Sequence, residues 1–455
     1  MTIGSIDPTS GYRMRSCGEM TWDEIEHRVQ TAHRAFGTWR RLGHERRADL
    51  MRNAAVRLRA HRDPYAQLMA LEMGKPLAQG LSEIEKCARV CEYYAEHAQG
   101  FLSPEEVRTD ASKSYVAFEP LGVLLAVMPW NFPFWQVFRA AVPALMAGNT
   151  VLLKHASNVP DCAEAIEDVF RAAGFPEGAF TNLYIGTART GVLIDHPLVK
   201  AVTLTGSVPA GRSIGARAGS ALKKTVLELG GSDAYIVLED ADLDEAVGAC
   251  AASRLINGGQ SCVSAKRFVV AAGVHDAFLK GFLHLMRSQK MGDPMKADTT
   301  LGPMARKDLR DELHLQVTDS VAQGAKLLLG GHIPEEEGFY YPPTVLSEVR
   351  PGMRAFDEEL FGPVAAVIRA RDEADAIRLA NDTVFGLGAA IFTRDAAKGE
   401  RIAREELKAG CAFVNGYVRS DIRLPFGGVD QSGHGRELGI FGIREFVNIK
   451  TVHIR

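Results

Sequence analysis

The sequence predicts an α/β fold built on parallel sheets, and three observations favour it. From residue 121 onward, short apolar runs typical of buried strands alternate with amphipathic helical segments. Hydrophobic residues make up 46% of the chain and charged residues 24%, as in ordinary globular proteins. With 455 residues, the chain is longer than one core usually serves. We therefore expect two or three domains, closely joined because no low-complexity linker is visible.

The segment before the first strand is expected to be helical. In residues 22–42 the apolar side chains recur on one helical face, and residues 48–73 continue in the same style. A third helical stretch, residues 81–101, carries Cys87 and Cys91 four residues apart. That spacing suits two metal ligands, but no further ligand lies nearby in the sequence, so a helix packing face is the preferred interpretation.

Two series of strands and helices follow. The first series contains predicted strands at 121–129, 149–155, 182–186, 199–207 and 232–240, with helices at 138–148 and 163–174. The second series begins near residue 241 and repeats the alternation. Two further segments, residues 112–120 and 444–455, alternate like strands but have no obvious sheet of their own. We expect both to contribute to self-association as a homodimer or homotetramer.

Composition argues against several classes of protein. A net charge of −3 gives no sign of a nucleic-acid or membrane-surface partner. The most hydrophobic run, residues 121–130, is about half the length of a membrane span. Seven scattered cysteines without CxxC spacing do not indicate a disulfide framework, and the 13 histidines form no metal-binding pattern. We expect a cytoplasmic protein with reduced thiols and no metal.

Cys262 lies in the stretch LINGGQSCVSAKR, residues 255–267, among glycines and small polar residues. A free thiol with a pKa near 8.5 is roughly 3% thiolate at pH 7, and a nearby positive charge would raise that fraction. Gly258 and Gly259 would let backbone approach a ligand closely. Cys262 is therefore a candidate nucleophile, and the alternative is a buried structural cysteine.

Two further side chains suit acyl chemistry. Glu228 ends an apolar stretch before two glycines, where desolvation would raise its pKa toward that of a useful base. The alternative is an ordinary loop carboxylate. Asn131 stands between Trp130 and Phe132 with prolines nearby, as a rigid donor for developing negative charge or as a simple turn residue.

No GxGxxG motif follows a predicted strand. The segment 202–219 nevertheless runs from a strand through Thr-Gly-Ser into a helix, and such a helix N-terminus can bind phosphate. On its own this signal is weak.

Taken together, these motifs resemble the aldehyde dehydrogenase family over nearly the whole chain. PWNFP, LELGG, GQSC, EELFGPV (358–364) and LPFGG (424–428) carry the resemblance. MPWNFPFWQVF, LLKHASNVP and VLELGGSD are similar to the bacterial succinate-semialdehyde dehydrogenases in that family. The resemblance implies an aldehyde dehydrogenase-like fold: a Rossmann-type NAD(P)-binding domain at 1–104 and 121–230, an α/β catalytic domain at 231–430, and a small β oligomerisation element at 105–120 and 443–455.

The resemblance also implies roles for the residues that match the family's motifs. Cys262 attacks the aldehyde and forms a thiohemiacetal, Asn131 and the backbone N–H of Cys262 hold the oxyanion, and Glu228 activates the water that hydrolyses the thioester. The implied cofactor-binding residues are Trp130, Lys154, Ser157, Gly206, Ser207, Leu229, Glu359 and Phe361. Ser157 stands where many NAD-preferring relatives have glutamate, which favours NADP over NAD because a hydroxyl does not repel a 2′-phosphate.

For the substrate, the resemblance implies that Arg139 and Ser420 bind the distal carboxylate of succinate semialdehyde. The alternative for Arg139 is an ion pair at the surface or between domains. Better-known relatives carry a second arginine where this chain has Ile256. A broad-range aldehyde dehydrogenase, a glutarate-semialdehyde dehydrogenase and a non-catalytic homologue therefore stay open as alternatives.

Overall fold

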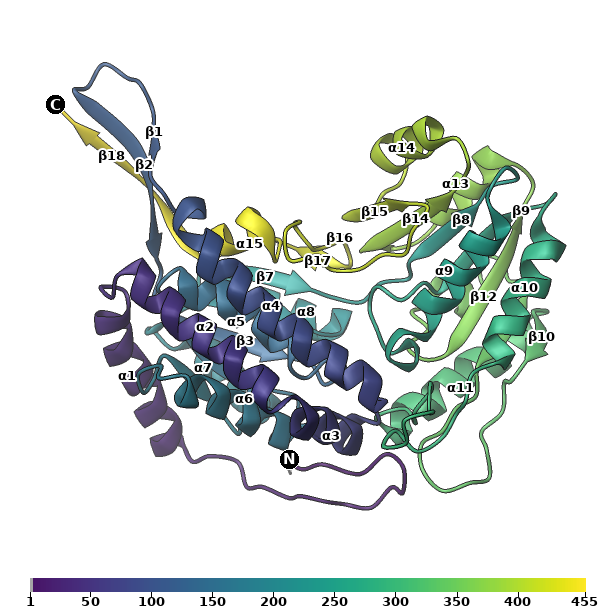
Figure 1. Cartoon of the computed structure of the whole chain (residues 1–455), viewed down its shortest axis with the longest axis horizontal. Coiled ribbons are helices and arrows are strands. Elements are labelled where there is room, and N and C mark those ends of the chain that lie inside the picture. The colour runs from purple at the N-terminus through teal and green to yellow at the C-terminus, as the bar shows by residue number, and fades with distance from the viewer. Residues whose placement is uncertain (1–2) are drawn as a thin grey trace.

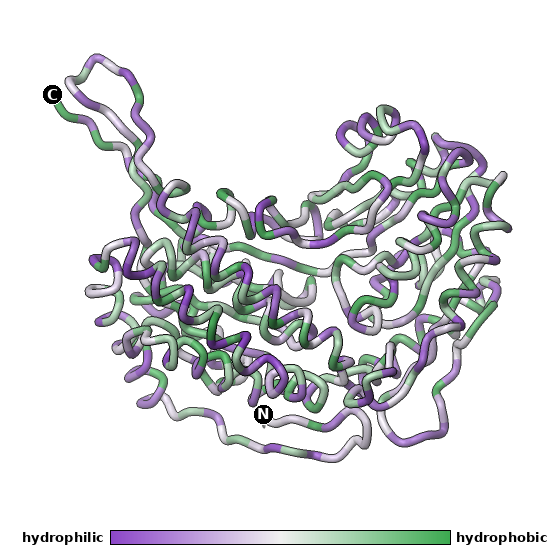
Figure 2. The backbone as a smooth tube through the Cα atoms, in the orientation of Figure 1, coloured by the Kyte–Doolittle hydropathy of each residue, from purple (hydrophilic) through white to green (hydrophobic). Residues whose placement is uncertain are grey.

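The computed structural model describes residues 3–455 and has two α/β bodies side by side, each built around its own sheet, with a β ribbon projecting from the first body (Figure 1). In Figure 2 the strands at the centre of both bodies are mostly hydrophobic. The strands Val123–Met128 and Arg267–Ala271, one from each body, are buried along their whole length. Burial of apolar strands on both faces is what parallel sheets covered by helices require.

Four helices open the chain where the sequence predicts three helical stretches: α1 (Trp22–Trp39), α2 (His44–Ala60), α3 (Arg62–Met73) and α4 (Leu77–Phe101). The prediction of one continuous helix over 48–73 is wrong, because the helix breaks at His61. Pro64 explains the break, since proline has no N–H to donate and its ring clashes with the preceding turn, so it is tolerated only in the first turn of a new helix.

The first body is built on a six-stranded sheet in the order β17-β7-β6-β3-β4-β5. Its strands are β3 (Val123–Met128), β4 (Thr150–His155), β5 (Phe180–Asn182), β6 (Val199–Thr205), β7 (Lys224–Glu228) and β17 (Gly433–His434). All neighbours are parallel except β17 and β7. The connecting helices are α5 (Trp135–Met146), α6 (Pro160–Ala172), α7 (Thr187–Asp195) and α8 (Val208–Ser220). The strand predicted at 182–186 lies earlier, at β5.

The second body has a seven-stranded sheet in the order β10-β11-β12-β9-β8-β14-β15, parallel except for β10. Its strands are β8 (Ala234–Val237), β9 (Arg267–Ala271), β10 (Lys326–Leu329), β11 (Thr344–Ser347), β12 (Val364–Ala370), β14 (Gly388–Phe392) and β15 (Cys411–Val414). Its helices are α9 (Leu243–Leu255), α10 (His275–Arg287), α11 (Lys307–Ala322), α12 (Arg354–Asp357), α13 (Glu373–Asn381) and α14 (Ala396–Glu405).

After β15 the chain returns to the first body. The short strand β16 (Val429–Asp430) pairs with β13 (Phe385–Gly386), and β17 then pairs with β7 so that Gly433 lies opposite Glu228. Helix α15 (Gly439–Glu445) follows. The predicted end of the catalytic domain at residue 430 stays a prediction. The return of the chain places Gly433, in the C-terminal segment, beside Glu228 at the end of β7.

The projecting ribbon contains β1 (Glu105–Glu106), β2 (Lys113–Pro120) and β18 (Val447–Ile454) (Figure 1). Strand β18 pairs antiparallel with β2 of the same chain along its whole length. Within residues 3–455 no strand pairs with its other edge, and Ile449 on that strand is 61% exposed. The two segments singled out in the sequence therefore pair with each other, and their role in self-association stays a prediction.

Candidate active site

A cavity of 620 Å³ contains Cys262 in its wall. The wall combines residues of α4 and α5 from the first body with the Cys262 loop and the segment after β15 from the second body. Three other residues singled out in the sequence, Arg139, Ile256 and Ser420, line the same cavity. The fold thus brings together side chains that are far apart along the chain.

A strained turn positions Cys262. Helix α9 ends in a 3₁₀ turn, Ile256–Gly259, in which Asn257 has a positive φ of 54° and Gly259 one of 75°. A Cβ atom built on Gly259 would lie 2.1 Å from the carbonyl oxygen of Gly362, so only glycine fits there. Gly259 thus lets the backbone of the Cys262 loop pack closely against the FGPV segment of the same chain, and this packing holds the loop in place.

The Cys262 thiol is half-buried at the cavity wall. Burial raises its pKa to about 12, although the positive charges of Arg139 and Lys266 act in the opposite direction. The Lys266 ammonium donates to the backbone carbonyls of Ser261, at 2.8 Å, and Cys262. The nearby cations that the sequence hypothesis required are present, but desolvation outweighs them, so the thiol is protonated at neutral pH.

Asn131 is 4% exposed and anchored to the Cys262 loop. Its side-chain Nδ2 donates to the backbone carbonyl of Gln260 at 3.0 Å. The backbone carbonyl of Asn131 accepts a hydrogen bond from Asn257 Nδ2 at 2.6 Å. A side-chain amide has two N–H groups, so one N–H of Asn131 stays available. A fixed amide donor beside the nucleophile's loop fits the oxyanion role implied by the sequence.

Glu228 ends β7 and is 2% exposed, and neither carboxyl oxygen has a hydrogen-bond partner among the described residues. Burial raises its pKa well above the usual range, and the neighbouring Glu437 adds to that rise while Arg139 opposes it. The side chain lies behind the cavity wall and does not line it. A carboxyl group whose pKa is raised by burial is a candidate acid or base.

Arg139 lines the cavity but is largely engaged by the protein itself. Its Nε forms a buried ion pair with Glu437, its Nη2 donates to Thr205 Oγ1 at 3.2 Å, and its guanidinium lies 4.8 Å from the centre of the Phe426 ring. Arg139 does form an ion pair, but it is buried within the first body and does not lie at the surface or between the two bodies, as the alternative interpretation expected. Contact between Arg139 and a substrate carboxylate stays a prediction, and Glu437 is a partner that sequence reasoning missed.

Ser420 has an unexpected neighbour. Its Oγ accepts a hydrogen bond at 2.6 Å from the ammonium of Lys86, which also lies 4.0 Å from the centre of the Trp135 ring. Sequence reasoning missed Lys86. The available signal was helical spacing: Gln79, Ser82 and Lys86 stand three and four residues apart and line one wall of the cavity.

The predicted dinucleotide-binding residues lie around the carboxyl ends of the first sheet. Lys154 ends β4, burial lowers the pKa of its ammonium, and the described residues give it no hydrogen-bond or ion-pair partner. Ser157 follows nearby, and its carbonyl accepts from the N–H of Gly4 at 2.9 Å. Ser207 caps α8 by accepting from the N–H of Ala210, and Gly206 donates to the carbonyl of Glu228 at 2.9 Å. A half-buried ammonium without a partner, on the same sheet whose strand β6 leads into the N-terminus of α8, fits a phosphorylated nucleotide.

The remaining predicted residues join the two bodies. The Glu359 carboxylate accepts from the N–H of Gly231 at 3.0 Å and pairs with Lys266 at 3.5 Å. Phe361 meets Trp130 edge to face, with ring centres 5.8 Å apart. The N–H of Leu229 donates to the carbonyl of Ser432 at 3.0 Å. The structure thus brings Trp130, Glu359 and Phe361 into one region close to the Cys262 loop.

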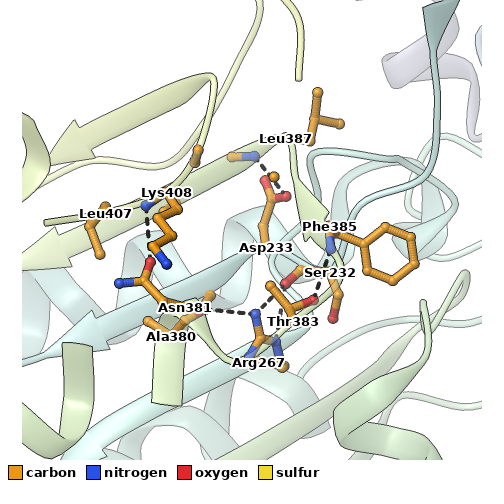
Figure 3. Close-up of a pocket in the computed structure, with 15 residues that line it drawn as sticks. Ser232, Asp233, Arg267, Ala380, Asn381, Thr383, Phe385, Leu387, Leu407 and Lys408 are labelled. Atoms are coloured by element: carbon orange, nitrogen blue, oxygen red, sulfur yellow. Dashed lines mark hydrogen bonds between the residues drawn. The ribbon is translucent and has the colours of Figure 1, made fainter. Parts of the chain in front are cut away.

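A second cavity, of only 20 Å³, lies inside the second body around Asp233 and Arg267 (Figure 3). Most of its polar groups bond to the protein: Arg267 donates to the carbonyls of Ser232 and Ala380, and Asp233 Oδ1 accepts from the N–H of Gly388. Ser232 Oγ and Asp233 Oδ2 have no partner among the described residues. The space is too small for a substrate. Across residues 3–455 there is no group of three or more side chains suited to a metal ion, and no helix has the length and apolar character to span a bilayer.

Comparison with known proteins agrees with this geometry. The model of the aldehyde dehydrogenase family matches residues 1–452. The succinate semialdehyde dehydrogenase [NAD(P)+] Sad of Escherichia coli is 49% identical over 98% of this chain and 97% of its own. The succinate-semialdehyde dehydrogenase [NADP(+)] 1 of Mycobacterium tuberculosis is 46% identical over the full length of both chains.

A solved structure extends the agreement to three dimensions. The succinic semialdehyde dehydrogenase of Streptococcus pyogenes, solved in complex with NADP+, superposes with a TM-score of 0.97, 36% identity and 99% coverage of both chains. The predicted α/β fold with Rossmann-type parallel sheets is thereby confirmed, as is the resemblance on which it depends. The chain belongs to the aldehyde dehydrogenase family.

Proposed function

We propose that this protein oxidises succinate semialdehyde to succinate with NADP as the preferred acceptor. The observation that carries the proposal is identity of 46–49% over essentially the whole chain to relatives named as succinate-semialdehyde dehydrogenases, NADP(+) among them. The cavity supports it, because Cys262 shares its wall with hydroxyl and cationic side chains suited to a carboxylate-bearing aldehyde.

In the proposed mechanism, Cys262 Sγ gives its proton to solvent and bonds to the aldehyde carbon, whose carbonyl oxygen becomes an oxyanion. The free N–H of Asn131 and the backbone N–H of Cys262 stabilise the oxyanion, and each such donor lowers the barrier by about 3–4 kcal/mol. The chemistry that NADP would supply when bound is acceptance of the hydride from that carbon, after which Cys262 carries a thioester. Glu228 then takes a proton from the water that attacks the thioester, the C–S bond breaks, the acid leaves, and the proton passes from Glu228 to Cys262 Sγ.

The Glu228 step requires the carboxyl group to give up its proton and to reach water at the thioester. Its oxygens have no hydrogen-bond partner that would hold them in place, which supports such a movement. Burial raises the pKa of Glu228 above that of an ordinary carboxylate, which supports its use as a stronger base once it is deprotonated.

The residues that would hold NADP are Trp130, Lys154, Ser157, Gly206, Ser207, Leu229, Glu359 and Phe361. Lys154 supports NADP because its half-buried ammonium has no partner among the described residues and would be neutralised by a phosphate. Ser157 adds a hydroxyl and no repulsive charge.

We also propose a homodimer or homotetramer that works in the cytoplasm. The projecting ribbon, with an exposed edge at β18, supports self-association. All seven cysteines are free in the structure, which supports a reducing compartment.

The decisive experiment measures kcat/KM for succinate semialdehyde, glutarate semialdehyde and butanal, each with NADP and with NAD. We expect succinate semialdehyde with NADP to exceed every other combination by about tenfold or more. An equal or higher value for glutarate semialdehyde would favour that substrate, and an equal value for butanal would favour a broad-range enzyme. A large preference for NAD would overturn the cofactor proposal alone.

A further inference from the structure

Lys86 occupies a fixed place in the wall of the Cys262 cavity. It stands in the middle of α4, and its ammonium is held between the Trp135 ring on α5 and the Ser420 hydroxyl in the segment after β15. Side chains from two other segments of the chain therefore fix one long, otherwise flexible lysine on α4. Such fixing is expected where a charge must be aimed at a ligand.

The positive charge of Lys86 has no counter-ion. Within residues 3–455, no carboxylate lies within 4.0 Å of its Nζ, and the two closest in its surroundings have other partners. Glu83, on the same helix, pairs with Lys75, and Asp421 pairs with Arg423 at 2.7 Å. The Lys86 side chain is half-buried in the cavity wall. A partly desolvated ammonium without a counter-ion is stabilised by a ligand that supplies a negative charge.

The surroundings of Lys86 lower the pKa of its ammonium to about 8. Desolvation is the main cause, and the positive charge of Arg139 on α5 lowers the pKa further. Glu83 and Cys87 on α4 and Asp421 in the loop act in the opposite direction and only partly offset it. A carboxylate that entered the cavity would restore the charged form of the lysine.

Arg139 is less available than Lys86 to bind a carboxylate, because Glu437 already neutralises its charge and Thr205 Oγ1 accepts from one of its N–H groups. We propose that Lys86 is the substrate-binding cation of this enzyme and that it binds the distal carboxylate of the aldehyde together with Ser420. This inference rests on the proposed function, since it names the residue that recognises a semialdehyde's carboxylate.

The hydrogen-bonding capacity of the pair fits that role. An ammonium has three N–H donors: one is used by Ser420 and the Trp135 ring faces the group, so donor capacity remains for a carboxylate oxygen. The Ser420 oxygen accepts from Lys86, which leaves its own O–H free to donate. One carboxylate can thus accept from both side chains.

The test compares Lys86→Met with the unchanged enzyme on succinate semialdehyde and on butanal, which has the same four carbons without the carboxylate. We expect kcat/KM for succinate semialdehyde to fall about 100-fold, mainly through KM, with butanal changed less than about threefold. Arg89→Met, on the exposed side of the same helix, is the matched control and should alter neither substrate. Equal loss on both aldehydes in Lys86→Met would overturn the proposal.

The pH profile gives a second readout. The ratio of KM for succinate semialdehyde to KM for butanal should stay flat below about pH 8 and rise above it, where the Lys86 ammonium loses its proton. Lys86→Arg should keep binding and abolish that rise, because an arginine stays charged. A rise that persists unchanged in Lys86→Arg would contradict the assignment.

Failure of the proposed function would give a different result from failure of the Lys86 proposal. If the unchanged enzyme does not favour succinate semialdehyde over butanal, the proposed substrate is wrong. The same comparison with glutarate semialdehyde and pentanal then decides the role of Lys86: a preference for the charged aldehyde that Lys86→Met abolishes supports it. Absence of any preference for a carboxylate in the unchanged enzyme overturns it.

Discussion

Two cations in different parts of the molecule have opposite environments. Arg267 is buried in the interior of the second body and donates to the carbonyls of Ser232 and Ala380 (Figure 3). It also donates to the carbonyls of Leu379 and Asp382, and it lies 5.2 Å from the centre of the Phe356 ring. Lys86 is half-buried in the wall of the Cys262 cavity and contacts one hydroxyl and one aromatic ring. Only the first cation has all its N–H groups bonded by the protein.

The contrast between the two cations does not extend to every polar group around them. Both oxygens of Glu228, Oδ1 of Asn131 and Oε1 of Gln136 are buried without a hydrogen-bond partner among the described residues. Beside Arg267, Ser232 Oγ and Asp233 Oδ2 are also buried without a partner. The comparison teaches that a cation bonded to several backbone carbonyls stabilises the fold, whereas one with a single hydroxyl partner keeps N–H groups free for a ligand.

The largest effect should come from the nucleophile. Cys262→Ala removes the atom that bonds to the aldehyde carbon, so aldehyde oxidation should fall by about 10⁴-fold or more. The thermal unfolding midpoint should change by less than about 3 °C, because the thiol is half-buried and makes no hydrogen bond that the fold needs.

Activity measurements on the purified variant, with calorimetry on the same sample, check both parts. Cys250→Ala is the matched control, since Cys250 is fully buried in the core of the second body and does not line the cavity. We expect the reverse result there: lower stability with activity per folded molecule kept. A catalytically competent Cys262→Ala would refute the nucleophile assignment.

The same substitution in the two cation environments should have opposite consequences for stability. Arg267→Met leaves four backbone carbonyls without their donor and should lower the free energy of unfolding by about 3–5 kcal/mol. Lys86→Met removes an ammonium that has no counter-ion, and should change that free energy by less than about 1 kcal/mol or raise it. Urea denaturation of both variants measures the difference. A larger loss in Lys86→Met than in Arg267→Met would break the comparison.

The strands were predictable because both sheets are buried on two faces. The run 121–129 is continuously apolar and the run 149–155 has an apolar centre, VLL, and the structure places β3 and β4 inside them. Breaks within helices are set by more local events: Pro64 divides a stretch that is uniformly helical in its hydrophobic pattern. The pairing of β2 with β18 could not be derived, since strand pattern does not name a partner.

In the site, the residues that carry the chemistry were predictable from family motifs, and their partners were not. Cys262, Glu228 and Asn131 stand in the motifs GQSC, LELGG and PWNFP. Lys86 meets Ser420 across 334 residues, so only the folded chain brings the two together. Local sequence shows Lys86 as one more charged residue on a helix, because burial of a charge depends on what packs over it.

The smallest effect concerns how burial and neighbouring cations compete at Cys262. Since burial raises the thiol pKa to about 12 despite Arg139 and Lys266, the thiolate fraction should rise about tenfold for each pH unit between pH 7 and pH 10. The rate of iodoacetamide alkylation at Cys262 in the free enzyme, followed by peptide mass spectrometry, should rise in proportion. A plateau below pH 9 would mean that the two cations outweigh desolvation. In that case the free enzyme would already hold a thiolate, and the cavity would be ready for attack without help from any base.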